Sequence, residues 1–200
     1  MSTHGDLLPG FDDYGSEANA VFRTCLTALS RPGLIQDFAP HLEAPAPLLP
    51  GAAAVLLTLA DYETTFWLDA TLARVAAVAD FLRFHTGARQ IDDAADADFA
   101  VIADPLTMPA LSDFKLGTPE FPDRSTTLIV QVEQLQAAGM TFRGPGIKDR
   151  VALSASPLTV DFARQLAANR QAFPCGVDVI FVAPSNLAAL PRSVNLLSEA

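Results

Sequence analysis

Three strand-length runs of almost entirely apolar residues constrain the fold more than any other feature of this chain. The runs are FAVIA at residues 99–103, TTLIVQV at 126–132 and VDVIFV at 177–182. A strand that is apolar on both faces has to be covered on both sides of its sheet. Helical patterns alternate with these runs, and the combination predicts an α/β fold in which helices pack on a mixed sheet. The pattern leaves the strand order open.

The length and the apolar content favour a single domain over residues 1–200. The chain has 200 residues, of which 50% are hydrophobic, and this suffices for one large core. No internal repeat divides the chain. Residues 1–15 are polar and lack a hydrophobic period, so we expect an N-terminal arm that is ordered only where another part of the chain holds it.

The charge balance argues against one class of function. The chain has 13 Lys and Arg against 23 Asp and Glu, a net charge of -10, whereas a nucleic-acid binder needs a basic face for the phosphates. The start MSTHGDLLPG lacks the basic and apolar regions of a secretory signal. The longest nearly apolar stretch, residues 51–60, is shorter than the roughly 20 residues of a membrane span. Cys25 and Cys175 show no metal-ligand spacing, and Cys25 lies on the apolar face of a helical pattern, so we expect a buried, reduced thiol. Together these features predict a cytoplasmic protein that binds neither nucleic acid nor membrane.

Hydrophobic periods and turn residues predict the remaining elements. One helix begins at Ser16, which can cap it, and ends at Pro32. Another begins at Ser156 and Pro157, which suit an N-cap and a first turn. The run at 140–142 is expected to pair with the strand at 126–132. Other expected helices cover 51–60 and 71–84, and other expected strands cover 34–38, 64–68, 151–153 and 187–190.

His85 and Asp61 are the candidate acid–base residues. His85 ends a helical pattern, and imidazole titrates near neutral pH, so it suits proton transfer. Asp61 lies in the turn before the strand at 64–68, where it could orient His85 or bind a cation. Each residue also has a structural interpretation, which we favour. His85 would complement the carboxyl end of its helix, and Asp61 would accept hydrogen bonds from backbone N–H groups of its own turn.

The run Gly144-Pro145-Gly146 is a second candidate site. Two glycines around a proline make a tight turn whose N–H groups could bind an anion, although a turn alone is the favoured interpretation. Neither metal-ligand spacing nor a Gly-x-Ser-x-Gly nucleophile elbow occurs. A Schiff-base cofactor needs a lysine held by the fold, and Lys115 and Lys148, the two lysines of the chain, lie in irregular segments. The residues alone therefore name no catalytic residue, no metal site and no cofactor site.

Six runs taken together resemble a known family. In chain order they are FRTCLTALSRPG at 22–33, LLTLADYETTFWL at 56–68, LRFHTGA at 82–88, FRGPGI at 142–147, FPCGVDVIFV at 173–182 and ALPR at 189–192. In order and spacing they are similar to the PhnH family, the H subunit of the bacterial carbon–phosphorus lyase core complex, over essentially the whole chain after the N-terminal arm. The candidate ligand or partner-contact residues in these runs are Arg31, Asp61, His85, Thr86, Gly144, Pro145, Gly146 and Arg192.

The resemblance implies a three-layer α/β/α sandwich related to the large domain of pyridoxal-phosphate-dependent transferases, without the cofactor. It also implies a homodimer in isolation and an assembly with the G, I and J subunits of the lyase. Together these subunits convert alkylphosphonates through a ribose 1-alkylphosphonate 5-triphosphate, and the nucleosidase and radical iron–sulfur chemistry belongs to the I and J subunits. The H subunit is then a required partner without catalytic residues.

Three functions remain open at this level. The first is a non-catalytic subunit of a phosphonate-degrading complex, with the proline-rich segment at 104–124 as a candidate interface. The second is a stand-alone enzyme that uses His85 with Asp61 on a phosphorylated sugar or phosphonate bound near residues 144–147. The third is a pyridoxal phosphate enzyme, which only the implied fold suggests.

Overall fold

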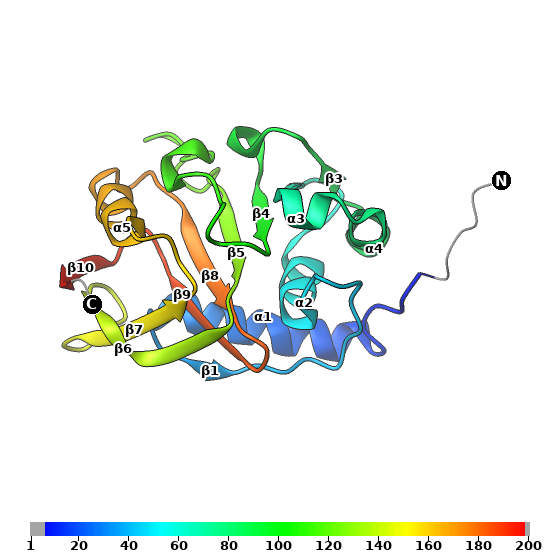
Figure 1. Cartoon of the computed structure of the whole chain (residues 1–200), viewed down its shortest axis with the longest axis horizontal. Coiled ribbons are helices and arrows are strands. Elements are labelled where there is room, and N and C mark those ends of the chain that lie inside the picture. The colour runs from blue at the N-terminus through cyan, green and yellow to red at the C-terminus, as the bar shows by residue number, and fades with distance from the viewer. Residues whose placement is uncertain (1–6, 199–200) are drawn as a thin grey trace.

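Seven strands form the central sheet of the computed structural model, which describes residues 7–198 (Figure 1). Their order across the sheet is β1-β9-β8-β5-β4-β2-β3. The strands from β8 to β3 run parallel, whereas β9 and β1 at the other edge pair antiparallel. The strands are β1 (Gln36–Asp37), β2 (Thr65–Leu68), β3 (Arg89–Gln90), β4 (Phe99–Ile102), β5 (Thr127–Gln131), β8 (Asp178–Val182) and β9 (Asn186–Leu190). The predicted α/β class and the mixed sheet are therefore confirmed.

The three apolar runs lie side by side in the middle of this sheet as β4, β5 and β8. Successive residues point to opposite faces, so that Ile129 and Ile180 belong to one hydrophobic cluster and Leu128 and Val179 belong to the other. All four side chains are fully buried. The runs are apolar throughout because both faces of the sheet are covered.

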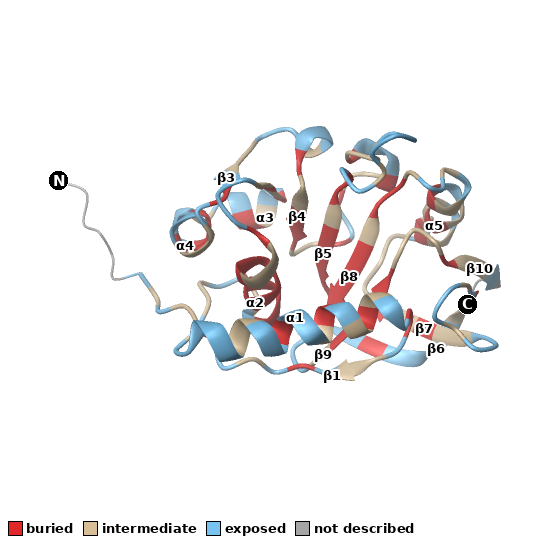
Figure 2. Ribbon diagram, turned by 180° about the vertical axis from the view of Figure 1, so that it is seen from behind, coloured by how far each residue is buried: buried red, intermediate tan, exposed pale blue. Residues whose placement is uncertain are grey.

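Helices α1 (Tyr14–Ser30), α2 (Pro50–Leu59) and α4 (Ala76–Thr86) cover one face of the sheet. α2 packs between α1, α4 and β5, and its residues from Gly51 to Leu57 are all buried. Figure 2 shows buried residues concentrated in α2 and in the central strands, whereas α1 crosses the lower part of the molecule with an exposed outer side. α1 is therefore the outermost helix of this layer.

The other face of the sheet is covered by α5 (Phe162–Gln171) and by a second, antiparallel sheet. That sheet has the order β10-β6-β7 and consists of β6 (Gln134–Arg143), β7 (Val151–Ser156) and β10 (Asn195–Ser198). Phe142, Leu153 and Phe162 are buried in the same cluster as Phe181 of the central sheet. The molecule has three layers, but one outer layer is part helix and part sheet, so the expected α/β/α description is correct for one side only.

Two predictions for the β6–α5 region are wrong. The run at 140–142 belongs to β6 and pairs with β7 and β10, because both edges of β5 are already occupied by β4 and β8. Ser156 is the last residue of β7, where it pairs with Gln134. Its backbone is extended there, so it caps no helix, and α5 begins only at Phe162.

The helix boundaries near the N-terminus also differ from the predictions. α1 begins at Tyr14 because the Asp13 carboxylate accepts a hydrogen bond from the Ser16 N–H at 3.3 Å, so Asp13 and not Ser16 is the cap. The helix predicted at 71–84 is divided into α3 (Ala70–Ala73) and α4, because the backbone at Val75 is extended. The strand expected at 34–38 is shortened to the two-residue edge strand β1.

The segment at 104–124 is irregular, as predicted. It contains one short 3-10 helix, η2 (Leu111–Asp113), and a similar turn, η1 (Ala94–Asp96), precedes β4. Leu111 and Phe114 anchor the segment in the second hydrophobic cluster. Within residues 7–198, no helix is both long enough and apolar enough to cross a membrane.

Candidate functional site

The N-terminal arm lies against His85. The His85 Nε2 atom is 3.0 Å from the Leu8 carbonyl oxygen, and the imidazole is in edge contact with Phe81 and Phe84. A Cβ atom added to Gly10 would lie 2.8 Å from His85 Nδ1, so the arm fits the ring closely. The described part of the arm is thus held at this point, whereas residues 1–6 lie outside the described residues.

Asp61 serves its own turn. Its carboxylate accepts a hydrogen bond from the Glu63 N–H at 2.9 Å, and its backbone N–H donates to Thr64 Oγ1 at 2.9 Å. Thr86 is committed in a similar way, because its hydroxyl donates to the Leu82 carbonyl and accepts from the Ala88 N–H. No hydrogen bond joins Asp61 to His85 in the part of the chain that the structure describes. The geometry therefore does not bring the two acid–base candidates together.

The turn Gly144-Pro145-Gly146 packs against the end of α1. Gly146 has a positive φ of 80°, and a Cβ atom there would lie 2.1 Å from the Ser30 carbonyl oxygen. Gly144 approaches the backbone of Ser193 and Val194 in the same way. The structure thus brings together three of the runs singled out in the sequence, those that contain Arg31, Gly146 and Arg192. The glycines are explained by this close backbone packing.

Arg192 makes a two-pronged ion pair with Asp178. Arg192 Nε donates to Asp178 Oδ1 at 3.1 Å, and Nη2 donates to Oδ2. A further guanidinium N–H donates to the Pro122 carbonyl oxygen. The side chains of Arg192 and Asp178 are only 14% and 20% exposed. This arginine therefore fastens the irregular segment to the start of β8 and has little free hydrogen-bonding capacity for a ligand.

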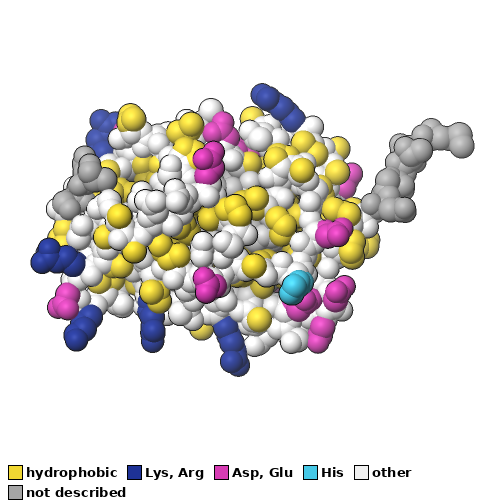
Figure 3. All heavy atoms as spheres, turned by 60° about the horizontal axis from the view of Figure 1, so that its bottom comes forward, with side chains coloured by type: hydrophobic (Ala, Val, Ile, Leu, Met, Phe, Trp, Pro, Cys, Tyr) yellow, Lys and Arg dark blue, Asp and Glu magenta, His cyan; other side chains and the backbone are white. Residues whose placement is uncertain are grey.

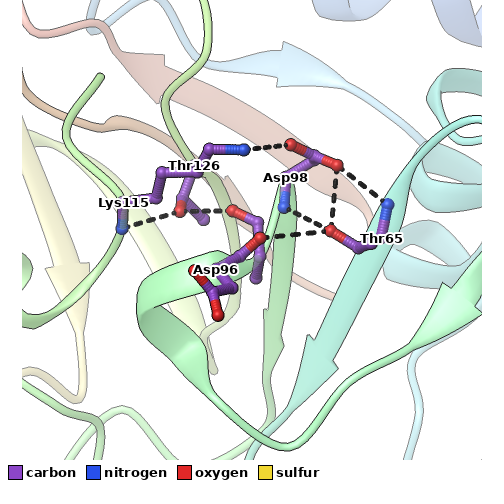
Figure 4. A network of polar contacts seen from close by, with 6 residues as sticks. Thr65, Asp96, Asp98, Lys115 and Thr126 are labelled. Carbon is purple, nitrogen blue, oxygen red and sulfur yellow. Dashed lines mark hydrogen bonds and ion pairs between the residues drawn. The ribbon is translucent and has the colours of Figure 1, made fainter. Parts of the chain in front are cut away.

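A polar network joins the amino-terminal ends of β2, β4 and β5 (Figure 4). Lys115 Nζ pairs with Asp98 Oδ1 at 2.8 Å, and Asp98 Oδ2 accepts from both the backbone N–H and the hydroxyl of Thr65 at 2.9 Å. The Thr126 hydroxyl donates to the Ala97 carbonyl at 2.6 Å. Each polar side chain of this network forms a hydrogen bond with a group from another segment of the chain. The network therefore stabilises the strand ends.

We expect the Asp98 carboxylate to contribute stability at neutral pH that disappears in acid. Partial burial raises its pKa, but hydrogen bonds from Lys115 and Thr65 outweigh burial, and the pKa lies below the ordinary value. Such a group stabilises the fold above the unfolded value, near 3.9, and this contribution is lost as the pH falls through the lower folded value. Asp98→Asn should therefore lower the free energy of unfolding by about 0.5–1 kcal/mol at pH 7 and by less at pH 3.

Urea unfolding at the two pH values measures this difference. Asp96→Asn is the matched control, because Asp96 enters the network through its backbone carbonyl and not through its carboxylate. If Asp98→Asn and Asp96→Asn lose the same stability at both pH values, the role assigned to the Asp98 carboxylate is wrong.

The carboxyl ends of the parallel strands are where α/β folds of this kind usually bind ligands, at the point where the strand order reverses. Here that point lies between β2 and β4, and the side chain of Asp69, only 3% exposed, is located there. Its Oδ1 accepts from the Leu72 N–H at 2.9 Å, and its Oδ2 accepts from the N–H groups of Ala103 and Asp104 at 2.8 Å. The backbone donors that would bind an anionic ligand are thus occupied by the protein's own carboxylate.

A cavity of about 390 Å³ lies beside this point, at the ends of β4 and β5. Its polar side chains are those of Asp104, Gln131 and Glu133, and its lining contains no basic residue. The Gln131 amide already binds the Leu49 N–H and the Pro47 carbonyl. Because two carboxylates and no cation face this space, it disfavours a phosphate or phosphonate group.

The described residues support neither a metal site nor a reactive cysteine. No group of three or more His, Cys, Asp or Glu side chains is arranged to hold a metal ion within residues 7–198. Cys25 is buried in α1, and burial raises the pKa of its thiol to about 12, so that it stays protonated at neutral pH. This is the environment of a structural cysteine.

Sequence reasoning missed three structurally decisive aspartates, Asp69, Asp98 and Asp178. Each lies at the beginning or end of a buried strand, and each carboxylate binds backbone or side-chain donors from another segment. The available signal was an acidic residue at or near the end of a strand-length run: Asp69 follows the run at 64–68, Asp98 precedes FAVIA, and Asp178 is the second residue of VDVIFV. That signal does not tell which donors a carboxylate will meet, because the donors come from distant parts of the chain.

Comparisons with known proteins find relatives along the whole chain. A family model described as "Bacterial phosphonate metabolism protein (PhnH)" matches residues 9–197. A protein of Rhizobium meliloti (strain 1021) named "Alpha-D-ribose 1-methylphosphonate 5-triphosphate synthase subunit PhnH" is 38% identical over 201 residues, which is 100% of both chains. The "Putative C-P lyase subunit protein HtxG" of Stutzerimonas stutzeri is 29% identical over 181 residues, which is 88% of this chain and 84% of that protein.

Proposed function

Since the chain belongs to the PhnH family of bacterial phosphonate metabolism proteins, we propose that it is a non-catalytic subunit of a carbon–phosphorus lyase complex. In this role it is required for alkylphosphonate catabolism, while partner subunits form the ribose 1-alkylphosphonate 5-triphosphate and cleave the C–P bond. The observation that carries the proposal is the match over the full length to a relative named as a synthase subunit.

The geometry supports a role without chemistry of its own. Asp61 and Thr86 are used by local backbone groups, Arg192 is paired with Asp178, and Asp69 occupies the position where a ligand usually binds in this kind of fold. An enzyme needs a nucleophile or base within hydrogen-bonding distance of an orienting group, facing a space for the substrate. The candidate pair His85 and Asp61 lacks such a contact.

The further features of the proposal come from the resemblance of the six sequence runs. We infer that the partners are the G, I and J subunits, that the isolated chain is a homodimer, and that the protein acts in the cytoplasm as a single domain. We also infer a relationship of the fold to the large domain of pyridoxal-phosphate-dependent transferases. The lysines do not suit that cofactor, because Lys115 is paired with Asp98 at the amino-terminal ends of the strands and Lys148 lies exposed in the turn after β6.

Co-purification tests the proposal. A tagged form of this chain is expressed together with the G, I and J subunits of the same organism and isolated under gentle conditions. We expect the partners to elute with it, and the proposal fails if the tagged chain comes away alone. The presence of genes for these subunits beside the gene for this chain would provide an independent indication.

Growth on methylphosphonate as the sole phosphorus source separates the proposal from the enzyme alternative. A strain that lacks the gene should not grow, and the wild-type gene should restore growth. His85→Ala should restore growth equally well, because the contacts of the ring with the Leu8 carbonyl and with Phe81 and Phe84 are structural. Loss of growth with an intact, folded complex would instead assign chemistry to His85.

A further inference from the structure

Four basic residues from two distant segments of the chain meet where α1 ends. One segment follows α1 at residues 31–34, and the other is the turn between β6 and β7. A Cβ atom added to Gly146 would lie 2.9 Å from the Pro32 ring, and one added to Gly33 would lie 2.7 Å from Val151 Cγ1, so the two segments are in direct contact. The four residues, here called the basic patch, are Arg31, Arg143, Lys148 and Arg150. Figure 3 shows basic side chains gathered at the lower left, the side on which α1 ends beside β6 and β7 in Figure 1.

The basic patch contrasts with the rest of this acidic chain. Residues 30–34 and 143–151 contain four of the 13 Lys and Arg residues but only one of the 23 Asp and Glu residues, Asp149. All four basic residues are exposed. No ion pair within residues 7–198 uses any of them. The patch therefore presents positive charge to the solvent, although the chain as a whole has a net charge of -10.

A local structural role explains only a small part of this charge. The carboxyl end of a helix carries about half a negative charge, far less than the charge of four basic side chains, of which Asp149 offsets one. The Thr27 carbonyl in the last turn of α1 is bound by the backbone N–H of Arg31 at 2.9 Å, so that bond does not need the guanidinium. A surplus of exposed positive charge remains, and such a surplus attracts and orients a binding partner.

The turn at the middle of the patch is poorly suited to a small anion. A phosphate site of this type needs backbone N–H groups that converge on an open concavity. Here the Ile147 N–H is bound to the Gly144 carbonyl at 3.1 Å. Gly146 faces the Ser30 carbonyl oxygen, which an added Cβ atom would approach to 2.1 Å. An acceptor oxygen beside the turn repels an anion, so the exposed side chains, and not the turn, have to provide the contacts.

We propose that the basic patch is the surface by which this protein docks on an acidic face of another subunit of the lyase complex. The proposal rests on the proposed function and adds the docking surface and the chemistry of the partner. Three of the four basic residues are arginines, which are enriched in protein interfaces and can bind a carboxylate through two N–H groups. Leu34, beside the patch, is 42% exposed and provides an apolar contact.

The charge of the whole chain determines how such a partner approaches. With a net charge of -10, most of this protein's surface repels an acidic partner, whereas the basic patch attracts it. Complementary charges of this kind accelerate encounter and fix the orientation of the two proteins. Because salt screens exposed charges, we expect the Kd for the partner to rise with the salt concentration.

Biolayer interferometry of the full chain with the purified assembly of the G, I and J subunits tests the patch. The double variant Arg31→Glu, Lys148→Glu should raise the Kd at least about tenfold. Its Kd should also change less than that of the wild type between about 50 mM and about 300 mM salt. The control is Arg74→Glu, Arg89→Glu, which changes the net charge equally at exposed residues after α3 and on β3, the edge strand far from β9 and α1. Its Kd should equal that of the wild type, and thermal melts confirm that both variants fold.

Carbodiimide coupling tests the chemistry of the partner directly. The reagent joins a lysine amine to a carboxylate as an amide, and the chain has only two lysines, of which Lys115 is paired with Asp98. Mass spectrometry of the coupled complex should find Lys148 joined to an Asp or Glu of a partner subunit. Lys148→Arg keeps the charge but has no amine, so it should retain the wild-type Kd and lose this product. If Lys148 in the saturated complex couples only to carboxylates of its own chain, the proposal is contradicted.

Two other results would overturn the proposal and leave the proposed function standing, because in both the wild-type chain still binds the assembly. The first is an equal Kd for the charge-reversed variant and its control. The second is one-to-one binding of inorganic triphosphate, or binding of duplex DNA, that only the variant Arg31→Glu, Lys148→Glu abolishes, since the patch would then serve a phosphate ligand. A wild-type chain that does not bind the assembly contradicts both the docking surface and the proposed function.

Discussion

Asp69→Ala should lower the free energy of unfolding by about 3–5 kcal/mol. The substitution removes a buried carboxylate and leaves three backbone N–H groups, those of Leu72, Ala103 and Asp104, without their acceptor. Hydrogen bonds to charged groups are worth about 1.5–3 kcal/mol each, and an unsatisfied buried donor costs about 1–3 kcal/mol. For a chain of this size the loss corresponds to a fall in Tm of about 10 °C.

Asp104→Ala is the matched control for this experiment. Asp104 is the neighbouring carboxylate, but it is only half-buried and accepts hydrogen bonds from Leu106 and Thr107 within its own turn. Urea unfolding should place its loss below about 1 kcal/mol. Equal losses in the two variants would show that Asp69 does not hold the ends of β2 and β4 together.

Gly146→Ala should cost about 2–4 kcal/mol of stability. The backbone at Gly146 has a φ of 80°, a conformation that costs an L-residue about 1–2 kcal/mol. The new Cβ would also lie 2.1 Å from the Ser30 carbonyl oxygen and 2.9 Å from the Pro32 ring, so the turn has to move away from the end of α1. Denaturant unfolding measures the loss.

Gly15→Ala controls for the change of residue type. Gly15 lies in the first turn of α1, where an added Cβ meets only the Asp13 carboxylate at 3.7 Å. Alanine there should be neutral or stabilise the protein by up to about 1 kcal/mol, because it is the better helix former. A Gly146→Ala variant as stable as Gly15→Ala would contradict the close packing of the turn against α1.

The central sheet and most of its helical cover could be predicted because they depend on local patterns. The runs that became β4, β5 and β8 are too short and too apolar for a surface helix, and the Ala- and Leu-rich run of α2 begins at a proline that starts a helix well. The error at β6 has a different origin. Which strands are neighbours depends on which sheet edges are already occupied, and no local pattern in β5 or β6 records that.

The candidate site was predicted only in part. The glycine-rich turn, Arg31 and Arg192 were singled out, and the structure brings their runs together at one end of α1. The structural interpretation of Asp61 is confirmed, because its carboxylate binds the backbone of its own turn. His85 was expected to complement the end of its own helix, whereas its ring binds the Leu8 carbonyl of the N-terminal arm. The role of Asp69 was missed, because its two bonds to the end of β4 join positions more than thirty residues apart.

The sequence by itself determined the fold class, the acidic charge and the family of this protein. These depend on composition, on the hydrophobic period and on six runs in a fixed order. The tertiary structure alone decided which polar groups are already used, because burial and hydrogen bonding are properties of neighbours that are distant in sequence. It also decided that Phe22 and Leu26 remain exposed on α1, and that the turn after β6 packs against the end of this helix.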